Sequence, residues 1–170
     1  ETSNSLYDVT CDWLERTPRP GSVYGSTSDE KNVDDFIADY LLAHKKLYPD
    51  TNKDAVNFFE EESSLRRRRA GLVFIESYRE LPLLAWPRKL ISTLIELEQS
   101  MILWRTSHAR MVERMIGRRI GTGGSSGVDY LDMTTKYRVF VDLWAVRSIL
   151  IKKEALPELK NKEFYEFRGE

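Results

Sequence analysis

The chain has 170 residues, a formal net charge of −1 and one cysteine. This length is enough for one domain with a buried core. The near-zero charge gives no basis for binding nucleic acid or an anionic membrane, and the lone Cys11 excludes an internal disulfide and a cysteine-rich metal site. The sequence has neither the run of about 18 apolar residues that a membrane helix requires nor a signal-peptide pattern at its start. We therefore expect a cytoplasmic protein without a membrane partner.

Apolar residues recur at helical spacing in three segments before residue 80. Proline and glycine separate these segments, because both residues disfavour the continuation of a helix. The first segment has possible N-caps at Ser3, Asn4 and Ser5, and the connection over residues 81–87 is expected to be kinked by its prolines. We predict helices over Ser5–Arg16, from Asn32 or Asp34 to Leu47, and from about Asp54 towards Tyr78.

A fourth helix is predicted from Pro87 to about Arg118. At about 1.5 Å per residue it is on the order of 45 Å long, so we expect it to cross the body of the protein. Its apolar residues are spaced alternately four and three apart, which predicts a continuous seam that faces a partner. The seam consists of Leu90, Leu94, Leu97, Met101, Trp104, His108, Met111 and Met115. A neighbouring row contains Ile91, Ile95, Ile102, Val112 and Ile116.

The remaining apolar segments are short. Val128–Met133 is predicted to be a short helix, and Phe140–Leu150 is predicted to be helical. A strand is the alternative for this last segment, because periodicity alone does not assign a short apolar run. The predicted elements together indicate an all-α fold. We expect a helical bundle with one long central helix, over a single unit of residues 1–170.

His108 is a histidine on the apolar seam of the long helix. A lone histidine on such a face is most often a hydrogen-bonded core residue, and the alternative is a metal ligand. Flat and flexible side chains at Trp104, Met111 and Val112 suit contact with a macrocycle. The other histidine, His44, lies beside two lysines in the sequence and is expected to be solvent-exposed. Zinc and non-haem iron sites need several converging ligands, whereas haem iron needs one axial ligand.

The long helix is followed by a glycine-rich segment, Gly121–Gly127. Glycines allow close approach of the backbone to a ligand, and successive N–H groups in such a turn can bind an anion. The segment lacks the pattern of a Walker loop or a dinucleotide fingerprint, so a carboxylate is the more fitting anion. The alternative is a helix C-cap at Gly117 followed by a flexible linker. Arg118 beside it either neutralises haem propionates or is an ordinary surface residue.

Two other patterns suggest a function but have simpler explanations. The run Arg66–Arg69 suggests nucleic-acid contact, but pairing with Glu60–Glu62 on a solvated helix face is the favoured interpretation. A Ser-His-Asp triad would have to use His108, which has no carboxylate placed to orient it.

Taken together, the residues of this chain resemble the haem-binding C-terminal half of a known family. Trp104-Arg105-x-x-His108-x-x-Met111-Val112-x-Arg114-x-x-Gly117, followed by Gly121-Thr-Gly-Gly-Ser-Ser-Gly127-x-x-Tyr130-Leu131, is similar to the signature block of tryptophan 2,3-dioxygenases. Trp13–Pro18 and Tyr137–Arg147 resemble two further helices of that family. Val128-Asp129 is closer to the bacterial members. The resemblance covers nearly the whole chain.

The resemblance implies a haem b enzyme in which His108 is the axial iron ligand. It implies haem contacts for Trp104, Met111, Val112, Gly121 and Gly123, and a contact of Thr122 with the backbone of bound L-tryptophan. The reaction would insert both atoms of O₂ across the indole C2–C3 bond and give N-formylkynurenine, the first step of tryptophan catabolism by the kynurenine pathway.

The resemblance also implies a homotetramer and a longer protein. Members of the family are about twice this length, and their N-terminal half supplies the distal histidine and the residues that bind the substrate carboxylate. We therefore expect that half as a separate chain or a missing segment. The alternatives are a haem monooxygenase that acts on an indole in secondary metabolism, and a helical assembly module without haem.

Overall fold

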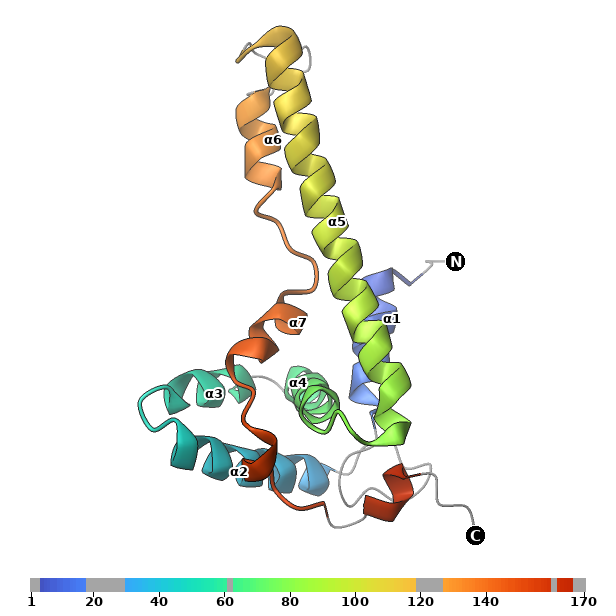
Figure 1. Cartoon of the computed structure of the whole chain (residues 1–170), viewed down its shortest axis with the longest axis vertical. Coiled ribbons are helices and arrows are strands. Elements are labelled where there is room, and N and C mark those ends of the chain that lie inside the picture. The colour runs from blue at the N-terminus through green and yellow to red at the C-terminus, as the bar shows by residue number, and fades with distance from the viewer. Residues whose placement is uncertain (1–3, 18–29, 61–62, 119–126, 160–161, 167–170) are drawn as a thin grey trace. The chain divides into compact units, whose positions relative to one another are not determined.

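The computed structural model describes residues 4–17, 30–60, 63–118, 127–159 and 162–166. Every secondary-structure element within these ranges is helical (Figure 1), which confirms the predicted all-α fold. The strand alternative for residues 140–150 is wrong, since this segment forms α7 and a 3-10 turn. No helix in the described ranges is long and apolar enough to cross a membrane.

Contacts divide the chain into two compact units. The first unit comprises Glu1–Leu90 and Asp142–Glu170, and the second comprises Ile91–Val141. The α-helices are α1 (Leu6–Glu15), α2 (Glu30–Leu47), α3 (Asn52–Phe59), α4 (Ser63–Ser77), α5 (Ala85–Ile116), α6 (Val128–Thr134) and α7 (Val141–Ala145). The 3-10 helices are η1 (Pro82–Leu84), η2 (Val146–Ser148), η3 (Lys153–Ala155) and η4 (Lys162–Tyr165).

The segment that was predicted as one helix from about Asp54 towards Tyr78 forms two helices, α3 and α4. α3 ends at Glu60, whose backbone has ψ of 72° and has left the helical region, while its N–H still bonds to the carbonyl oxygen of Val56 at 3.0 Å. Of the three N-caps that were predicted as possible for the first helix, Ser5 is the one observed. Its Oγ accepts the N–H of Asp8 at 3.2 Å, and the Asp8 carboxylate accepts the N–H of Ser5 at 3.0 Å. This reciprocal capping box fixes the start of α1, and the hydrogen bonds from Ser5 lower the pKa of Asp8.

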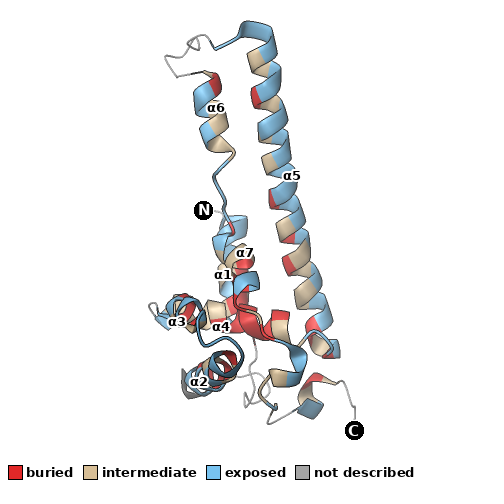
Figure 2. Ribbon diagram, turned by 60° about the vertical axis from the view of Figure 1, so that its left-hand side comes forward, coloured by how far each residue is buried: buried red, intermediate tan, exposed pale blue. Residues whose placement is uncertain are grey.

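Helix α4 is the core element of the first unit. Every residue from Ala70 to Glu76 is buried (Figure 2), so this half of the helix is enclosed on all sides instead of along one stripe. Helices α1, α2 and α3 all contact α4. The Phe74 ring meets Phe36 of α2 edge-on at 5.8 Å between ring centroids. The core of this unit is therefore built around one helix.

His44 lies on the buried stripe of α2, and its predicted exposure is wrong. The side chain is 1% exposed, and its ring lies 5.3 Å from the Tyr48 ring. Ile37 and Tyr40, at helical spacing before it, are buried as well. The prediction relied on neighbours in the sequence, whereas the face of a helix is set by residues three and four positions away.

The arginine run at the start of α4 connects this helix to other segments. The ion pairs join Arg66 to Asp34, Arg67 to Glu15 and Arg69 to Asp142, at N···O distances of 2.9, 3.9 and 3.0 Å. Arg69 also donates to the carbonyl oxygen of Phe58 at 2.9 Å. The predicted solvated face is wrong, because these arginines are half-buried and reach α1, α2 and the segment at residue 142. Glu61 and Glu62 lie outside the described residues.

Helix α1 crosses α4 at Gly71. A Cβ at this position would lie 2.5 Å from the carbonyl oxygen of Leu14 and 3.1 Å from the Cβ of Thr17. Both atoms belong to the chain around the end of α1 and cannot move independently of it. The close approach of these helices therefore requires glycine.

Gly71→Ala is expected to destabilise the protein by about 1–3 kcal/mol, the usual cost of inserting a methyl group into a filled contact. Helix propensity alone predicts the opposite sign, a gain of about 1 kcal/mol. The free energy of unfolding in urea decides between them. Asn57→Ala on the exposed side of α3 is the control and should change stability by less than about 0.5 kcal/mol. A Gly71→Ala protein more stable than wild type would contradict the contact.

In the second unit, α5 packs through a different row from the predicted seam. Buried and half-buried residues on one side are Ile91, Leu94, Glu98, Ile102, Arg105, Ala109 and Val112. The seam residues from Leu97 to Met115 lie about a quarter-turn away, given about 100° per residue. Apart from the half-buried His108, they are 42–75% exposed. The neighbouring apolar row, with Glu98 and Arg105 inserted into it, thus makes the internal contacts.

Glu98 is the buried anchor of this unit. Its side chain is 3% exposed, and one carboxylate oxygen accepts the N–H groups of Phe140, at 3.0 Å, and Val139. Residues 138–140 have no helical hydrogen bonds of their own. Because buried N–H groups need an acceptor, Glu98 holds this segment against the middle of α5.

Glu98→Ala is expected to cost about 2–4 kcal/mol, because it leaves two backbone donors without their acceptor. Glu98→Gln keeps an acceptor but loses the charge, so we expect a smaller loss of about 1–2 kcal/mol. Urea unfolding measures both, and amide hydrogen exchange at Val139 and Phe140 should become faster. Glu96→Gln, at an exposed position two residues away on a different face of α5, is the control. Equal stability of Glu98→Ala and wild type would show that Glu98 does not hold residues 139 and 140 against α5.

Candidate functional site

His108 lies on the outward side of α5 and is half-buried. The Trp104 ring, one helical turn earlier, stacks on the imidazole with 5.4 Å between ring centroids and 7° between ring planes. Within the described parts of the chain, neither imidazole nitrogen has a hydrogen-bond partner. Stacking occupies a face of the ring and leaves its nitrogen-bearing edge available to a ligand. This differs from the hydrogen-bonded core histidine that was the alternative interpretation.

Exposed apolar side chains surround His108 along the helix. We call Leu97, Met101, Trp104, Met111 and Met115 the apolar face of α5. Trp104 is 66% exposed and Met115 is 75% exposed. A continuous apolar strip of this kind marks a surface that binds a ligand or another protein. Val112, predicted to belong to the site, is half-buried beside it.

The donor set on this face fits a ligand that brings its own metal. In the described ranges, no group of three or more His, Cys, Asp or Glu residues is arranged to hold an ion. A haem supplies four nitrogen ligands itself and takes one axial ligand from the protein. His108, with aromatic and thioether side chains around it, offers such a ligand next to a surface suited to a flat macrocycle.

The glycine-rich segment is described only at its two ends. Gly117 ends α5 with a φ of +67°, and its N–H bonds to the carbonyl oxygen of Glu113 at 2.9 Å. Gly127, with a φ of +59°, directly precedes α6. Both ends have a positive φ, which glycine adopts more readily than any other residue. Gly121, Thr122 and Gly123 lie outside the described residues, and their predicted roles remain predictions.

Charged side chains join the two stems of this segment, a feature that the sequence analysis missed. Arg118, just after α5, pairs with Glu113 at 3.0 Å and with Asp129 of α6 at 2.8 Å. Arg110 pairs with Glu113 at 2.5 Å and with Asp132 of α6, and its hydrogen bond to Asp132 raises the pKa of the guanidinium. The carboxylates around Arg118 favour a structural role for this residue over neutralisation of a propionate.

Arg105 of α5 also contacts the end of α6 and the residues that follow it. Its guanidinium donates to the carbonyl oxygens of Thr134 and Tyr137, at 3.3 and 3.2 Å. The signal that sequence reasoning overlooked is a charged residue in an otherwise apolar helical row, at positions 98 and 105. Such residues are retained in buried rows when they satisfy backbone groups of another segment.

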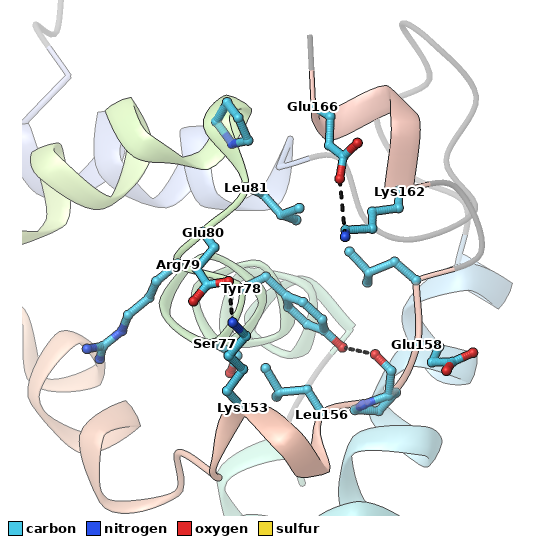
Figure 3. A pocket seen from close by; sticks show the side chains of 13 residues that line it. Ser77, Tyr78, Arg79, Glu80, Leu81, Lys153, Leu156, Glu158, Lys162 and Glu166 are labelled. Atoms are coloured by element: carbon cyan, nitrogen blue, oxygen red, sulfur yellow. Dashed lines mark hydrogen bonds and ion pairs between the residues drawn. The ribbon is translucent and has the colours of Figure 1, made fainter. Parts of the chain in front are cut away.

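The first unit contains a separate cavity of about 900 Å³ between the end of α4, η1, η3 and η4 (Figure 3). Across it, the Tyr78 hydroxyl donates to the carbonyl oxygen of Pro157 at 2.8 Å, and burial raises the pKa of that phenol. Lys153 pairs with Glu80 at 2.5 Å and Lys162 with Glu166 at 3.2 Å. Because both lysines already have carboxylate partners, the lining does not select a class of ligand.

The sequence of this chain is similar to the sequences of one known family. The family model described as tryptophan 2,3-dioxygenase matches residues 60–150. The chain is 61% identical over 140 residues to tryptophan 2,3-dioxygenase 2 of Ralstonia nicotianae, which covers 81% of this chain and 36% of that protein. It is 43% identical over 201 aligned positions to tryptophan 2,3-dioxygenase of Sorangium cellulosum, covering 98% of this chain and 48% of the relative.

A tryptophan 2,3-dioxygenase-like protein of Xanthomonas campestris is 60% identical over 107 residues, which is 63% of this chain and 40% of the relative. The chain therefore spans about half, or less, of the length of these curated relatives. The matched region contains α4, α5 and α6, and thus both His108 and the charged stems of the glycine-rich segment. On these matches, the chain belongs to the tryptophan 2,3-dioxygenase family.

Proposed function

We propose that this chain is the haem-binding half of a tryptophan 2,3-dioxygenase, which opens the indole ring of L-tryptophan with O₂ to give N-formylkynurenine. The observation that carries the proposal is His108, an imidazole on the exposed apolar face of α5 whose ring nitrogens have no hydrogen-bond partner among the described residues. Family membership supports the reaction, since the relatives are named for it. Both compact units of the chain would belong to this half.

His108 would hold the iron of haem b through its imidazole. Trp104 and Met111, which flank it, would contact the macrocycle, and Val112 would pack beside it. Haem, when bound, supplies the iron at which O₂ is activated. The stacked Trp104 limits rotation of the imidazole about its side-chain bonds and so holds the ligating edge in one direction. Orienting a ligand through its neighbours is a general way for a protein to tune a bound metal.

The glycine-rich segment would bind the substrate. Gly121 and Gly123 would contact the haem, and Thr122 would contact the amino-acid backbone of tryptophan. Such positioning lowers a barrier by fixing the geometry of the reacting groups. The remaining part of the site would come from an N-terminal half, on the same polypeptide or on a separate one.

Further properties follow from the same proposal. The assembled protein would be a homotetramer that works in the cytoplasm in tryptophan catabolism. A second candidate function, a helical assembly module without haem, is favoured only by the apolar face, which also fits a partner helix. Haem binding separates these two functions.

The first test is the absorption spectrum after haem reconstitution. The chain is prepared together with the half of the Sorangium cellulosum relative that lies outside the match. We expect a Soret band that is lost in His108→Ala, because that variant has no axial ligand, and retained in His44→Phe, which keeps a ring at the buried position. Near-wild-type urea unfolding of His108→Ala confirms that it folds. An unchanged Soret band in His108→Ala would reject the assignment.

The second test identifies the reaction. Product from L-tryptophan under ¹⁸O₂ is analysed by mass spectrometry. The dioxygenase proposal expects N-formylkynurenine that contains two labelled oxygen atoms, with turnover abolished in His108→Ala. A product with one added oxygen atom would instead identify a monooxygenase that acts on an indole.

A further inference from the structure

We propose that Arg114, together with the hydroxyl of Ser107, binds a carboxylate of the cofactor held at His108. The inference rests on the proposed function, since haem b carries two carboxylates at one edge of its macrocycle. It gives to Arg114 the charged contact that the sequence analysis considered for Arg118. Arg114, Ser107 and His108 all lie on α5 and within the described part of the chain.

Arg114 differs from the other arginines that follow Trp104 on this part of the chain. Arg105 donates to two backbone carbonyl oxygens, while Arg110 and Arg118 each pair with two carboxylates. Arg114 is exposed near the end of α5, and no hydrogen bond or ion pair engages it among the described residues. An arginine has five N–H donors in a fixed fork that suits a carboxylate. Arg114 therefore has donors left for a ligand.

A hollow of about 580 Å³ on the surface of α5 connects Arg114 with the apolar face. Met111 and Met115 belong both to this hollow and to the apolar face that would contact the macrocycle. The Ser107 hydroxyl has no hydrogen-bond partner in the described ranges and adds a second free donor. The hollow thus combines apolar contact with donors for an anion, as the ring and the charged edge of a haem require. Its lining residues are Thr106, Ser107, Arg110, Met111, Arg114 and Met115.

The helical repeat places Ser107 and Arg114 on the same side of α5. They are seven residues apart, nearly two full turns, so their directions differ by about 20°. Side chains of a helix lean towards its N-terminus, so the long side chain of Arg114 is expected to extend back towards Ser107. The Cα of Arg114 lies about 9 Å beyond that of His108 along the axis, at about 1.5 Å per residue. Donors offset from the imidazole in this way suit a ligand whose carboxylates lie apart from its metal.

The carboxylate belongs to the cofactor and not to the substrate. Under the proposed function, His108 would hold the haem from the side of α5, and tryptophan would react on the other side of the macrocycle. Ser107 and Arg114 are on the same helix as His108 and therefore on the side away from the substrate. Carboxylates at the edge of the macrocycle are the anionic groups that these two side chains would meet.

Haem b and its dimethyl ester, which lacks the two carboxylate charges, provide the test. Both pigments are titrated, by the Soret band, into the assembly used to test His108. In Arg114→Gln we expect haem b to bind about three- to tenfold more weakly, because a charged contact is lost, and the ester to bind as in wild type. Ser107→Ala should weaken only haem b, by about twofold. Arg114→Lys keeps the charge and should recover part of the affinity.

Arg118→Gln is the matched control, because its arginine is already paired with Glu113 and Asp129. It should leave the ratio of the two affinities as in wild type. The urea midpoint of the haem-free chain should not change in Arg114→Gln, since that side chain has no partner among the described residues. Equal affinity changes for the two pigments in Arg114→Gln, or no change for either, would overturn the carboxylate contact. A wild-type assembly that binds neither pigment would overturn the proposed function, and this inference with it.

Discussion

The helical repeat of α5 is the constraint on which the second unit depends. Each residue advances the direction of its side chain by about 100°, so a helix of 32 residues presents distinct faces along its whole length. One face, through Glu98, Arg105 and Ala109, is turned towards α6 and residues 134–140. The face a quarter-turn away carries Trp104 and His108 outward. The packing of the unit therefore determines which side chains are left for a ligand.

Polar side chains of α5 form hydrogen bonds with the backbone of a segment that has little secondary structure of its own. The chain between α6 and α7 has few hydrogen bonds of its own, and its backbone groups still need partners. Glu98 accepts the N–H groups of Val139 and Phe140, while Arg105 donates to the carbonyl oxygens of Thr134 and Tyr137. A non-helical segment is thereby held at two points on a rigid helix. This explains why charged residues interrupt an otherwise apolar row.

Sequence patterns within a few residues predicted the helices well. They did not predict which helices contact each other. The cap at Ser5, the extent of α5 and the short helix α6 follow from patterns within a few residues, and the structure contains all three. The burial of His44 and the partners of Arg66, Arg67 and Arg69 depend on which helices meet in space. The apolar seam of α5 was predicted at the correct spacing. What this seam contacts was not predicted, because periodicity defines the face of a helix but not the segment that packs on it.

The same limit applies to the candidate site. The sequence predicted His108 and Trp104 on one face, and the structure places their rings in contact. The ion pairs of Arg110 and Arg118 with α6 were missed, because their partners Asp132 and Asp129 lie 22 and 11 residues away in the sequence. A charge that looks free in the sequence, such as Arg118, is already matched by carboxylates.

The apolar face of α5 is exposed over much of its length in the described part of the chain. Exposed Trp104, Met111 and Met115 are costly to leave in water, since burial of apolar surface is worth about 25 cal/mol per Å². A flat cofactor bound at His108 would cover part of this face, but one helix can cover only one side of such a cofactor. Under the proposed function, other groups of the assembled enzyme would cover the remaining side of the cofactor and form the indole pocket.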